Sequence, residues 1–102
     1  MPVFEDDDNV VTDNKPKLKK PSFYTCVIFN DDFTPQDTVV HILVEVFKLS
    51  VDEATPIMKK VHRQGRANVG CYTWEIAEQK CYEAMSIARK DEYPLLLMPE
   101  NI

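Results

Sequence analysis

Polar residues at two places in the chain have side chains that could act in acid–base chemistry or bind a charged group. Asn30, Asp31 and Asp32 directly follow an apolar run, and His62 lies further along the chain. Aspartate and histidine are common general acids and bases, so these residue types are compatible with catalysis. They also have simpler uses, because Asn and Asp often bond to their own backbone in turns and an isolated histidine is often structural or solvated. Residue types alone leave these interpretations open.

Several features of common enzyme sites are absent from the sequence. The serines are Ser22, Ser50 and Ser86, and none stands in a setting typical of an activated nucleophile. With two glycines, the chain has no glycine-rich loop to hold a phosphate. The cysteines and histidines do not have the spacing of metal ligands. We therefore expect a protein that is not an enzyme and that uses no metal or cofactor.

Charge and cysteine content indicate the class of protein. The net charge of −5 argues against a nucleic-acid-binding protein, which usually carries a basic face. Cys26, Cys71 and Cys81 are an odd number without paired spacing, so we expect all three to be buried and reduced. No apolar run is long enough to span a membrane, and the N-terminal region lacks the apolar segment of a signal peptide. These features predict a cytoplasmic protein.

The distribution of charge divides the chain into two parts. Residues 1–21 contain an acidic run, four lysines and three prolines, with few apolar residues. Such a composition buries too little apolar surface to offset the entropy of folding, so we expect a flexible, disordered extension. Residues 22–102 hold enough apolar residues for a modest core, and we expect a single domain there.

The first strand and helix are predicted by an apolar run and a helix-start signal. Residues 24–29 are mostly aromatic or β-branched, which favours a buried strand. Thr34 followed by Pro35 has the pattern of an N-cap and a first helical residue. Apolar residues then recur at three- and four-residue steps, so a helix is expected over residues 35–48.

Further signals predict the second helix and the second strand. Ser50 and Glu53 have the spacing of a capping box. Gly65 should end the helix in a left-handed conformation, and Pro56 should cause a kink or an irregular first turn. Residues 66–72 then form a short strand candidate, with a weak point or bulge at the glycine inside it.

The last two elements complete the predicted fold. A third helix is expected from a Thr73 cap to about Lys90, with Trp74 and several small residues on its apolar face. A final strand is expected over residues 95–98. The order is strand, helix, helix, strand, helix, strand, which predicts an α+β fold with three helices packed on a small three-stranded antiparallel sheet.

Three blocks of the sequence, taken together, resemble the ClpS family of adaptor proteins. They are Asn30-Asp31-Asp32 with Thr34-Pro35, then Met58, Val61, His62 and Gly65, then Pro94-Leu95-Leu96. The resemblance covers residues 22–99 and includes the order of the elements. ClpS proteins carry proteins with particular N-terminal residues to a Clp AAA+ protease.

The resemblance implies roles for the polar corner and the second helix. Asn30, Asp31 and His62 would bind the free α-amino group of a substrate, because an ammonium has three donors and needs acceptors aimed at it. The first side chain of the substrate, implied to be Leu, Phe, Tyr or Trp, would enter a neighbouring pocket. The positions that match the family's pocket are Ile28, Asp32, Thr34, Gln36, Val39, Met58, Val61 and Leu95.

Gln36 departs from the family pattern. ClpS proteins usually place Met or another large aliphatic residue there, as a gate against β-branched side chains. The methylene groups of Gln36 could do the same steric work. Alternatively, its polar tip could change which side chains the pocket mouth tolerates.

The resemblance also implies a protein partner. Glu75 and Lys80 match family positions that contact the N-terminal domain of a ClpA-like AAA+ ATPase, although a solvated helix face would carry the same residues. The adaptor would deliver substrates to the ClpAP protease, and the partner would consume the ATP. The flexible extension would be engaged by the ATPase during this handover. Nothing in the sequence indicates an obligate dimer, so we expect a monomer.

Two other functions remain open on the sequence alone. The fold also resembles the C-terminal domain of a ribosomal stalk protein, so the chain could be another interaction module without recognition of N-terminal residues. A small hydrolase that used Asp31 and His62 is the other possibility, and it would turn over a peptide without any ATPase.

Overall fold

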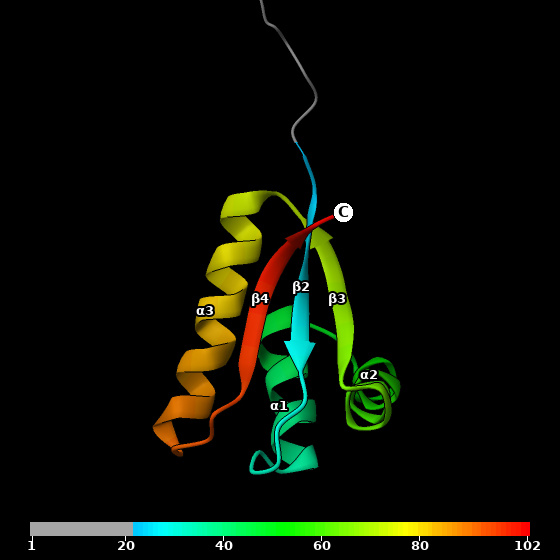
Figure 1. Cartoon of the computed structure of the whole chain (residues 1–102), viewed down its shortest axis with the longest axis vertical. Helices are drawn as coiled ribbons and strands as arrows, with labels where there is room; N and C mark the ends of the chain where they lie inside the picture. Colours follow the sequence, from blue (N-terminus) through cyan, green and yellow to red (C-terminus); the bar gives the residue numbers. More distant parts are fainter. Residues whose placement is uncertain (1–21) are drawn as a thin grey trace, which may run out of the picture.

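The computed structural model describes residues 22–102, and the extension expected over residues 1–21 lies outside the described residues. In chain order the elements are β2 (Tyr24–Phe29), α1 (Gln36–Phe47), α2 (Val51–Gln64), β3 (Arg66–Tyr72), α3 (Trp74–Lys90) and β4 (Leu96–Asn101). This order and the three-stranded antiparallel sheet confirm the predicted α+β fold. Figure 1 shows the helices on one side of the sheet, with α2 beside the end of β3.

The sheet is built around β2, with β3 and β4 as its edges. Both neighbours run antiparallel to β2, so that Ile28 lies opposite Ala67 on β3 and Leu97 on β4. The register with β3 shifts near the N-terminal end of β2, and Gly70 of β3 has a φ of +72° there. This irregularity is the bulge expected at that glycine. β4 extends over residues 96–101 and is therefore longer than the predicted run.

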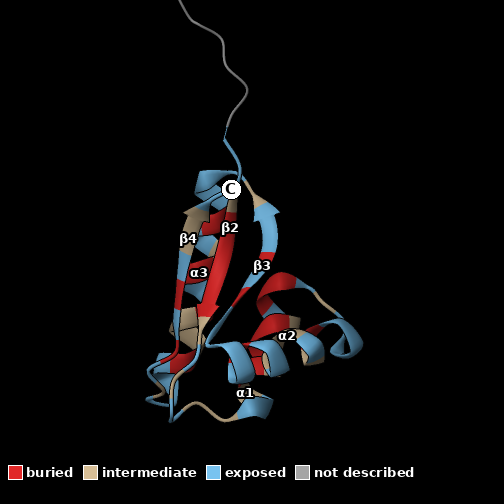
Figure 2. Cartoon of the chain, turned by 45° about the vertical axis from the view of Figure 1, so that its right-hand side comes forward, coloured by how far each residue is buried: buried red, intermediate tan, exposed pale blue. Residues whose placement is uncertain are grey.

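The core lies between the sheet and the helices. Cys26 and Ile28 of β2 are fully buried, and α1 presents a wide apolar face to them. α3 packs against β2 and β4 through small residues, which are Ala77, Cys81, Ala84 and Ala88. Figure 2 shows β2 buried along most of its length. Because burial of a large aliphatic side chain contributes about 1.5–3 kcal/mol, this packing fixes the strand whose end carries the polar corner.

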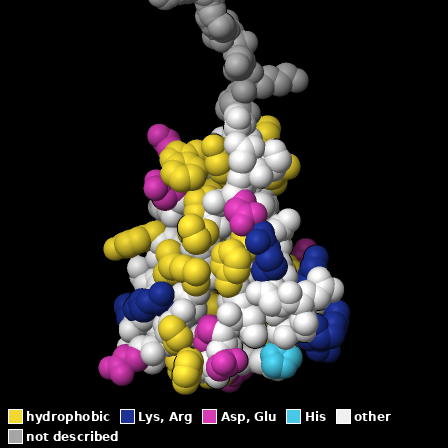
Figure 3. Space-filling model, in the orientation of Figure 1, with side chains coloured by type: hydrophobic (Ala, Val, Ile, Leu, Met, Phe, Trp, Pro, Cys, Tyr) yellow, Lys and Arg dark blue, Asp and Glu magenta, His cyan; other side chains and the backbone are white. Residues whose placement is uncertain are grey.

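No helix of residues 22–102 covers the opposite face of the sheet (Figure 1). Leu96 and Met98 of β4 are 43% and 49% exposed there. An ion pair of 2.6 Å between Arg66 and Glu100 joins the two edge strands across β2. Val27, on the central strand between them, is fully buried. Figure 3 shows hydrophobic side chains gathered on this face beside a basic and an acidic group.

The start of α1 shows that the predicted N-cap was wrong. Pro35 is the N-cap residue, with an extended backbone at φ −63° and ψ 149°. The Thr34 hydroxyl donates instead to the Asp31 carboxylate, at 2.8 Å from Oδ2. A hydrogen bond to an ionised carboxylate is stronger than a neutral cap bond, so the carboxylate determines how this hydroxyl is used.

One prediction of burial was also wrong. Cys26 and Cys81 are buried as expected, but Cys71 is exposed, because it lies at the bulge where the alternation of inward and outward residues is broken. Trp74 at the start of α3 is 45% exposed. Its ring packs edge-on against Tyr24, with 5.1 Å between the ring centroids.

The ends of α2 match the sequence prediction. Ser50 and Glu53 form both bonds of the capping box, at 2.9 Å and 3.1 Å. Gly65 has a φ of +90°, and its N–H donates to the carbonyl of Val61 at 2.8 Å. The helix continues through Pro56 without a break. Because Pro56 has no N–H, the carbonyl of Asp52 lacks its helical donor, while the residues on both sides of the proline remain helical.

Candidate functional site

One end of the domain carries a pocket, where the segment between β2 and α1 meets the C-terminal half of α2. Its volume is about 310 Å³, which is at the lower end of the range for small-ligand sites. The residues that line it are Asn30, Asp31, Asp32, Phe33, Thr34, Pro35, Gln36, Val39, Met58, Val61 and His62. The lining combines carboxylates, an amide and an imidazole with apolar side chains. Such a site can hold a group that is charged at one end and apolar at the other.

A backbone hydrogen bond brings the two halves of the pocket together. The N–H of Asn30, just after β2, donates to the carbonyl of Gly65 at 2.9 Å. Gly65 can aim this carbonyl across the gap because it adopts a left-handed conformation that disfavours residues with a Cβ atom. His62 lies one turn of helix before Gly65. The bond therefore sets the polar corner beside the helix end that carries His62.

Asp31 shapes the corner through its carboxylate. Oδ1 accepts from the backbone N–H groups of Phe33 and Thr34, at 2.8 Å and 2.7 Å. Oδ2 accepts from the Thr34 hydroxyl at 2.8 Å. A carboxylate has about four lone-pair positions, so Oδ2 retains the capacity to accept from a further donor. The turn interpretation and the binding interpretation of Asp31 are thus compatible.

The same contacts keep Asp31 ionised. Partial burial by itself would raise the pKa of Asp31, but the bonds from Thr34 and Phe33 and the positive charge of Arg89 outweigh it and hold the pKa below its usual value. Arg89 is fixed at the end of α3 by donating to the carbonyls of Tyr93 and Leu95, at 2.7 Å and 2.8 Å. The pocket therefore contains a carboxylate that is anionic over the physiological pH range.

The structure brings most of the predicted site residues together. Those that line the pocket are Asn30, Asp31, Asp32, Thr34, Gln36, Val39, Met58, Val61 and His62. Ile28 and Leu95, which the resemblance also assigned to the pocket, are 0% and 1% exposed and belong to the core instead of the lining. They can support the pocket wall from within the core.

Two lining residues were missed from the sequence, Phe33 and Pro35. Phe33 is 73% exposed, although it is a large apolar side chain. An aromatic residue inside a run of polar turn residues was the signal that could have identified it, because such a residue has no core to pack into.

The predicted contacts to an ATPase lie on α3, outside the pocket. Glu75 is exposed in the first turn. Lys80 is half-buried, and its Nζ donates to the carbonyl of Val46 near the end of α1 at 3.0 Å. The ammonium also lies over the rings of Phe47 and Tyr72, at 5.9 Å and 5.5 Å from their centroids. Lys80 therefore stabilises the end of α1 as well as presenting a charge at the surface.

The hydrogen bonds of the Asp31 carboxylate stay within its own turn. The Asp31 carboxylate is bonded to Phe33 and Thr34, and no hydrogen bond joins it to His62 within residues 22–102. That part of the chain also holds no group of three His, Cys, Asp or Glu residues placed to bind a metal ion. None of its helices is both long and apolar enough to cross a bilayer. What the pocket offers is a set of acceptors beside an apolar wall.

Known proteins are similar to this chain in sequence and in structure. The model of the family described as ATP-dependent Clp protease adaptor protein ClpS matches residues 19–98. The chain belongs to the ClpS family. The adapter protein ClpS 2 of Rhodopseudomonas palustris is 42% identical over 93 residues, which cover 91% of this chain and 85% of the relative. ClpS 2 of Bradyrhizobium diazoefficiens is 45% identical over 93 residues, covering 91% and 84%.

A solved structure of a similar protein contains a small ligand. The structure of Agrobacterium tumefaciens ClpS2 bound to L-phenylalaninamide has a TM-score of 0.80 and 34% identity, and it covers 81% of this chain and 100% of that chain. Phenylalaninamide carries a free α-amino group and an aromatic side chain. Membership of this family makes the chain a non-catalytic adaptor of Clp protease.

The lowered pKa of Asp31 predicts how the stability of the protein depends on pH. The ionised carboxylate stabilises the fold above about pH 4, and this contribution is lost as the pH falls through the lowered pKa. In Asp31→Asn the amide oxygen still accepts from the backbone but does not titrate. We expect Asp31→Asn to be less stable than wild type by about 1 kcal/mol or less at pH 7, with the difference shrinking towards pH 2. Urea unfolding at several pH values measures this.

The control for this prediction is Asp37→Asn, which removes an exposed carboxylate from the first turn of α1. Its stability at pH 7 should differ from that of wild type by less than the stability of Asp31→Asn does. If the difference in unfolding free energy between Asp31→Asn and wild type stays constant from pH 7 to pH 2, the lowered pKa of Asp31 is contradicted.

Proposed function

We propose that this adaptor binds proteins through a free N-terminal Leu, Phe, Tyr or Trp and delivers them to a ClpA-like AAA+ unfoldase. The α-ammonium of the substrate binds Asn30, Asp31 and His62, and the first side chain enters the pocket. One observation carries the proposal. Asp31 is held ionised with an open Oδ2 position, directly beside an apolar wall that includes Val39, Met58 and Val61.

The energetics of this mode of binding are adequate. Burial of a large apolar side chain is worth about 1.5–3 kcal/mol, which is too little to select a protein by itself. Hydrogen bonds to a charged group add about 1.5–3 kcal/mol each. Three such bonds and one buried side chain reach the region of micromolar binding, about 8 kcal/mol. The ammonium is thus needed for affinity and the side chain for selectivity.

The same geometry supports rejection of blocked N-termini. An acetylated terminus has lost its positive charge, so its binding would bury the Asp31 carboxylate without a counter-ion. Removing one partner of a buried charge pair costs on the order of 3–5 kcal/mol. Because Asp31 is only half-buried before binding, the cost at this site falls towards the lower end of that range.

Delivery requires a second surface, which we place on α3. Glu75 is exposed and available to a partner. Lys80 uses one of its three donors on Val46, so its remaining donors can reach the N-terminal domain of the ATPase. The partner pairs with the ClpP peptidase and consumes the ATP, and the adaptor works as a monomer in the cytoplasm. The extension over residues 1–21 is engaged during the handover.

Peptide binding tests the first half of this proposal. Fluorescence anisotropy with peptides that begin with Leu, Phe, Tyr, Trp, Ile or Met should show selective binding of the free Leu and aromatic termini. Acetylation should weaken binding at least a hundredfold, since about 3 kcal/mol is lost. Asp31→Ala should have a similar effect on the free peptides, whereas Asp37→Ala, with the same change of charge outside the pocket, should bind like wild type. Equal binding of free and acetylated peptides would show a module of another kind.

Gln36 provides a separate test of specificity. A substrate side chain that enters past Gln36 must remove water from a polar amide, which costs about 0.5–2 kcal/mol when no partner replaces the water. Gln36→Met should therefore tighten binding of apolar N-terminal residues about threefold or more and change their ranking. Gln64→Met makes the same chemical change at an exposed position outside the pocket and should change nothing. If Gln36→Met keeps the wild-type peptide preferences, the methylene groups alone set the width of the mouth.

A further inference from the structure

One side of α2 carries positive charge in an otherwise acidic chain. Residues 54–74 contain four of the twelve Lys and Arg residues and no Asp or Glu, while the whole chain has a net charge of −5. Lys59 and Arg63 stand four residues apart on α2, so their side chains lie together on one face of the helix. We name this pair the basic flank.

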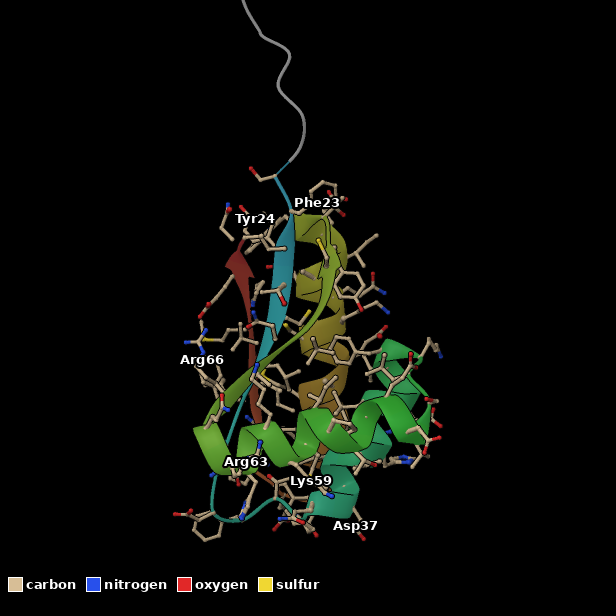
Figure 4. The ribbon with its side chains drawn as sticks, turned by 90° about the vertical axis from the view of Figure 1, so that its right-hand side faces the viewer. Phe23, Tyr24, Asp37, Lys59, Arg63 and Arg66 are labelled. Atoms are coloured by element: carbon tan, nitrogen blue, oxygen red, sulfur yellow. The ribbon has the colours of Figure 1, made fainter. Side chains whose placement is uncertain are left out.

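The basic flank adjoins the pocket. Met58 and His62 line the pocket from α2, and Lys59 and Arg63 are the next residues in the sequence. Successive helical residues are about 100° apart, so the flank lies one step around the helix from the pocket-lining face. Figure 4 shows Lys59 and Arg63 together on the outer side of α2, with Arg66 further along at the start of β3.

The charges of the basic flank are available to a ligand. Lys59 and Arg63 are both exposed, and neither forms an ion pair within 4.0 Å among residues 22–102. Arg66 differs, because it is paired with Glu100 at 2.6 Å and lies over the Phe29 ring at 5.2 Å from the centroid. The flank thus consists of the two cations beside the pocket that have no partner in the described part of the chain.

The two rims of the pocket therefore have opposite charge. Asp31 and Asp32 lie on the rim formed by the β2–α1 segment, and the basic flank borders the rim formed by α2. A bound substrate would place its ammonium at the acidic rim. Its chain must then leave the pocket, and a carboxylate further along it is repelled by Asp31 and Asp32 but attracted by Lys59 and Arg63.

We propose that the basic flank selects substrates that carry Asp or Glu a short distance after the N-terminal residue. This inference rests on the proposed function of the pocket. An α-helix with its side chains is roughly 10–12 Å across, and an extended peptide advances roughly 3.3 Å per residue. The flank is accordingly within reach of the third to fifth residues of a substrate. The partner chemistry is an acidic segment that follows a free, large apolar N-terminal residue.

The test compares three labelled peptides that all begin with Phe-Ala and carry Ser, Glu or Lys at positions three to five. Anisotropy with the full chain at about 50 mM salt should show the Glu peptide binding about three- to tenfold tighter than the Ser peptide, as expected for two exposed ion pairs. The advantage should largely disappear at about 300 mM salt, because exposed charges are screened. The Lys peptide should bind no tighter than the Ser peptide.

Matched variants separate the effect of the basic flank on peptide binding from the effect of the protein's net charge. Lys59→Gln with Arg63→Gln should leave binding of the Ser peptide unchanged and remove the advantage of the Glu peptide. Lys60→Gln with Lys90→Gln makes the same change of net charge at two exposed positions, one of them on another side of α2, and should retain the advantage.

The outcomes distinguish this inference from the proposed function. Equal affinity of the wild-type protein for the Glu and Ser peptides overturns the role of the basic flank. The role is also overturned if Lys59→Gln with Arg63→Gln keeps the advantage of the Glu peptide, or if Lys60→Gln with Lys90→Gln loses it to the same extent. If the Ser peptide itself does not bind, the proposed function of the pocket fails as well.

Discussion

The backbone hydrogen bond from Asn30 to Gly65 is the contact on which the site depends. It joins the end of the central strand to the end of α2 at 2.9 Å, and each partner is itself constrained. Asn30 directly follows β2, the central strand of the sheet, and Gly65 is the left-handed C-cap of α2. With this bond in place, the Asp31 carboxylate and His62 face one pocket. The packing of α2 against α1 and β3, and the pairing of Phe29 with Arg66, hold the same two segments together with this bond.

The fold separates the two surfaces to which the proposed function assigns roles. The pocket lies at the C-terminal end of β2, and Glu75 lies at the start of α3, whose first residue, Trp74, packs against Tyr24 at the other end of the same strand. A strand of this length spans about 20 Å. In the function proposed above, such a distance would let a substrate occupy one end of the domain while an ATPase holds the other. The rigid, buried strand between them keeps the two ends in a fixed orientation.

Local signals in the sequence predicted the elements well, and long-range packing caused the errors. The capping box at Ser50, the end of α2 at Gly65 and the element order each depend on neighbouring residues, so a pattern could reveal them. The use of the Thr34 hydroxyl depends on a competition between the helix start and the Asp31 carboxylate, which no pattern resolves. Cys71 is exposed because a bulge breaks the strand alternation. Most of the pocket lining was found only through the resemblance, since residues from β2, α1 and α2 meet there by tertiary packing.

The most direct test of the central claim is an NMR titration of the isotopically labelled protein with L-phenylalaninamide and with its N-acetylated form. The account predicts that phenylalaninamide perturbs the amide signals of Phe33 and Thr34, which donate to Asp31, together with those of Asn30 and the His62 region of α2. It also predicts that the acetylated form leaves these signals in place at the same concentration. Equal perturbation by both compounds, or changes confined to the open face of the sheet around Leu96 and Met98, would contradict it.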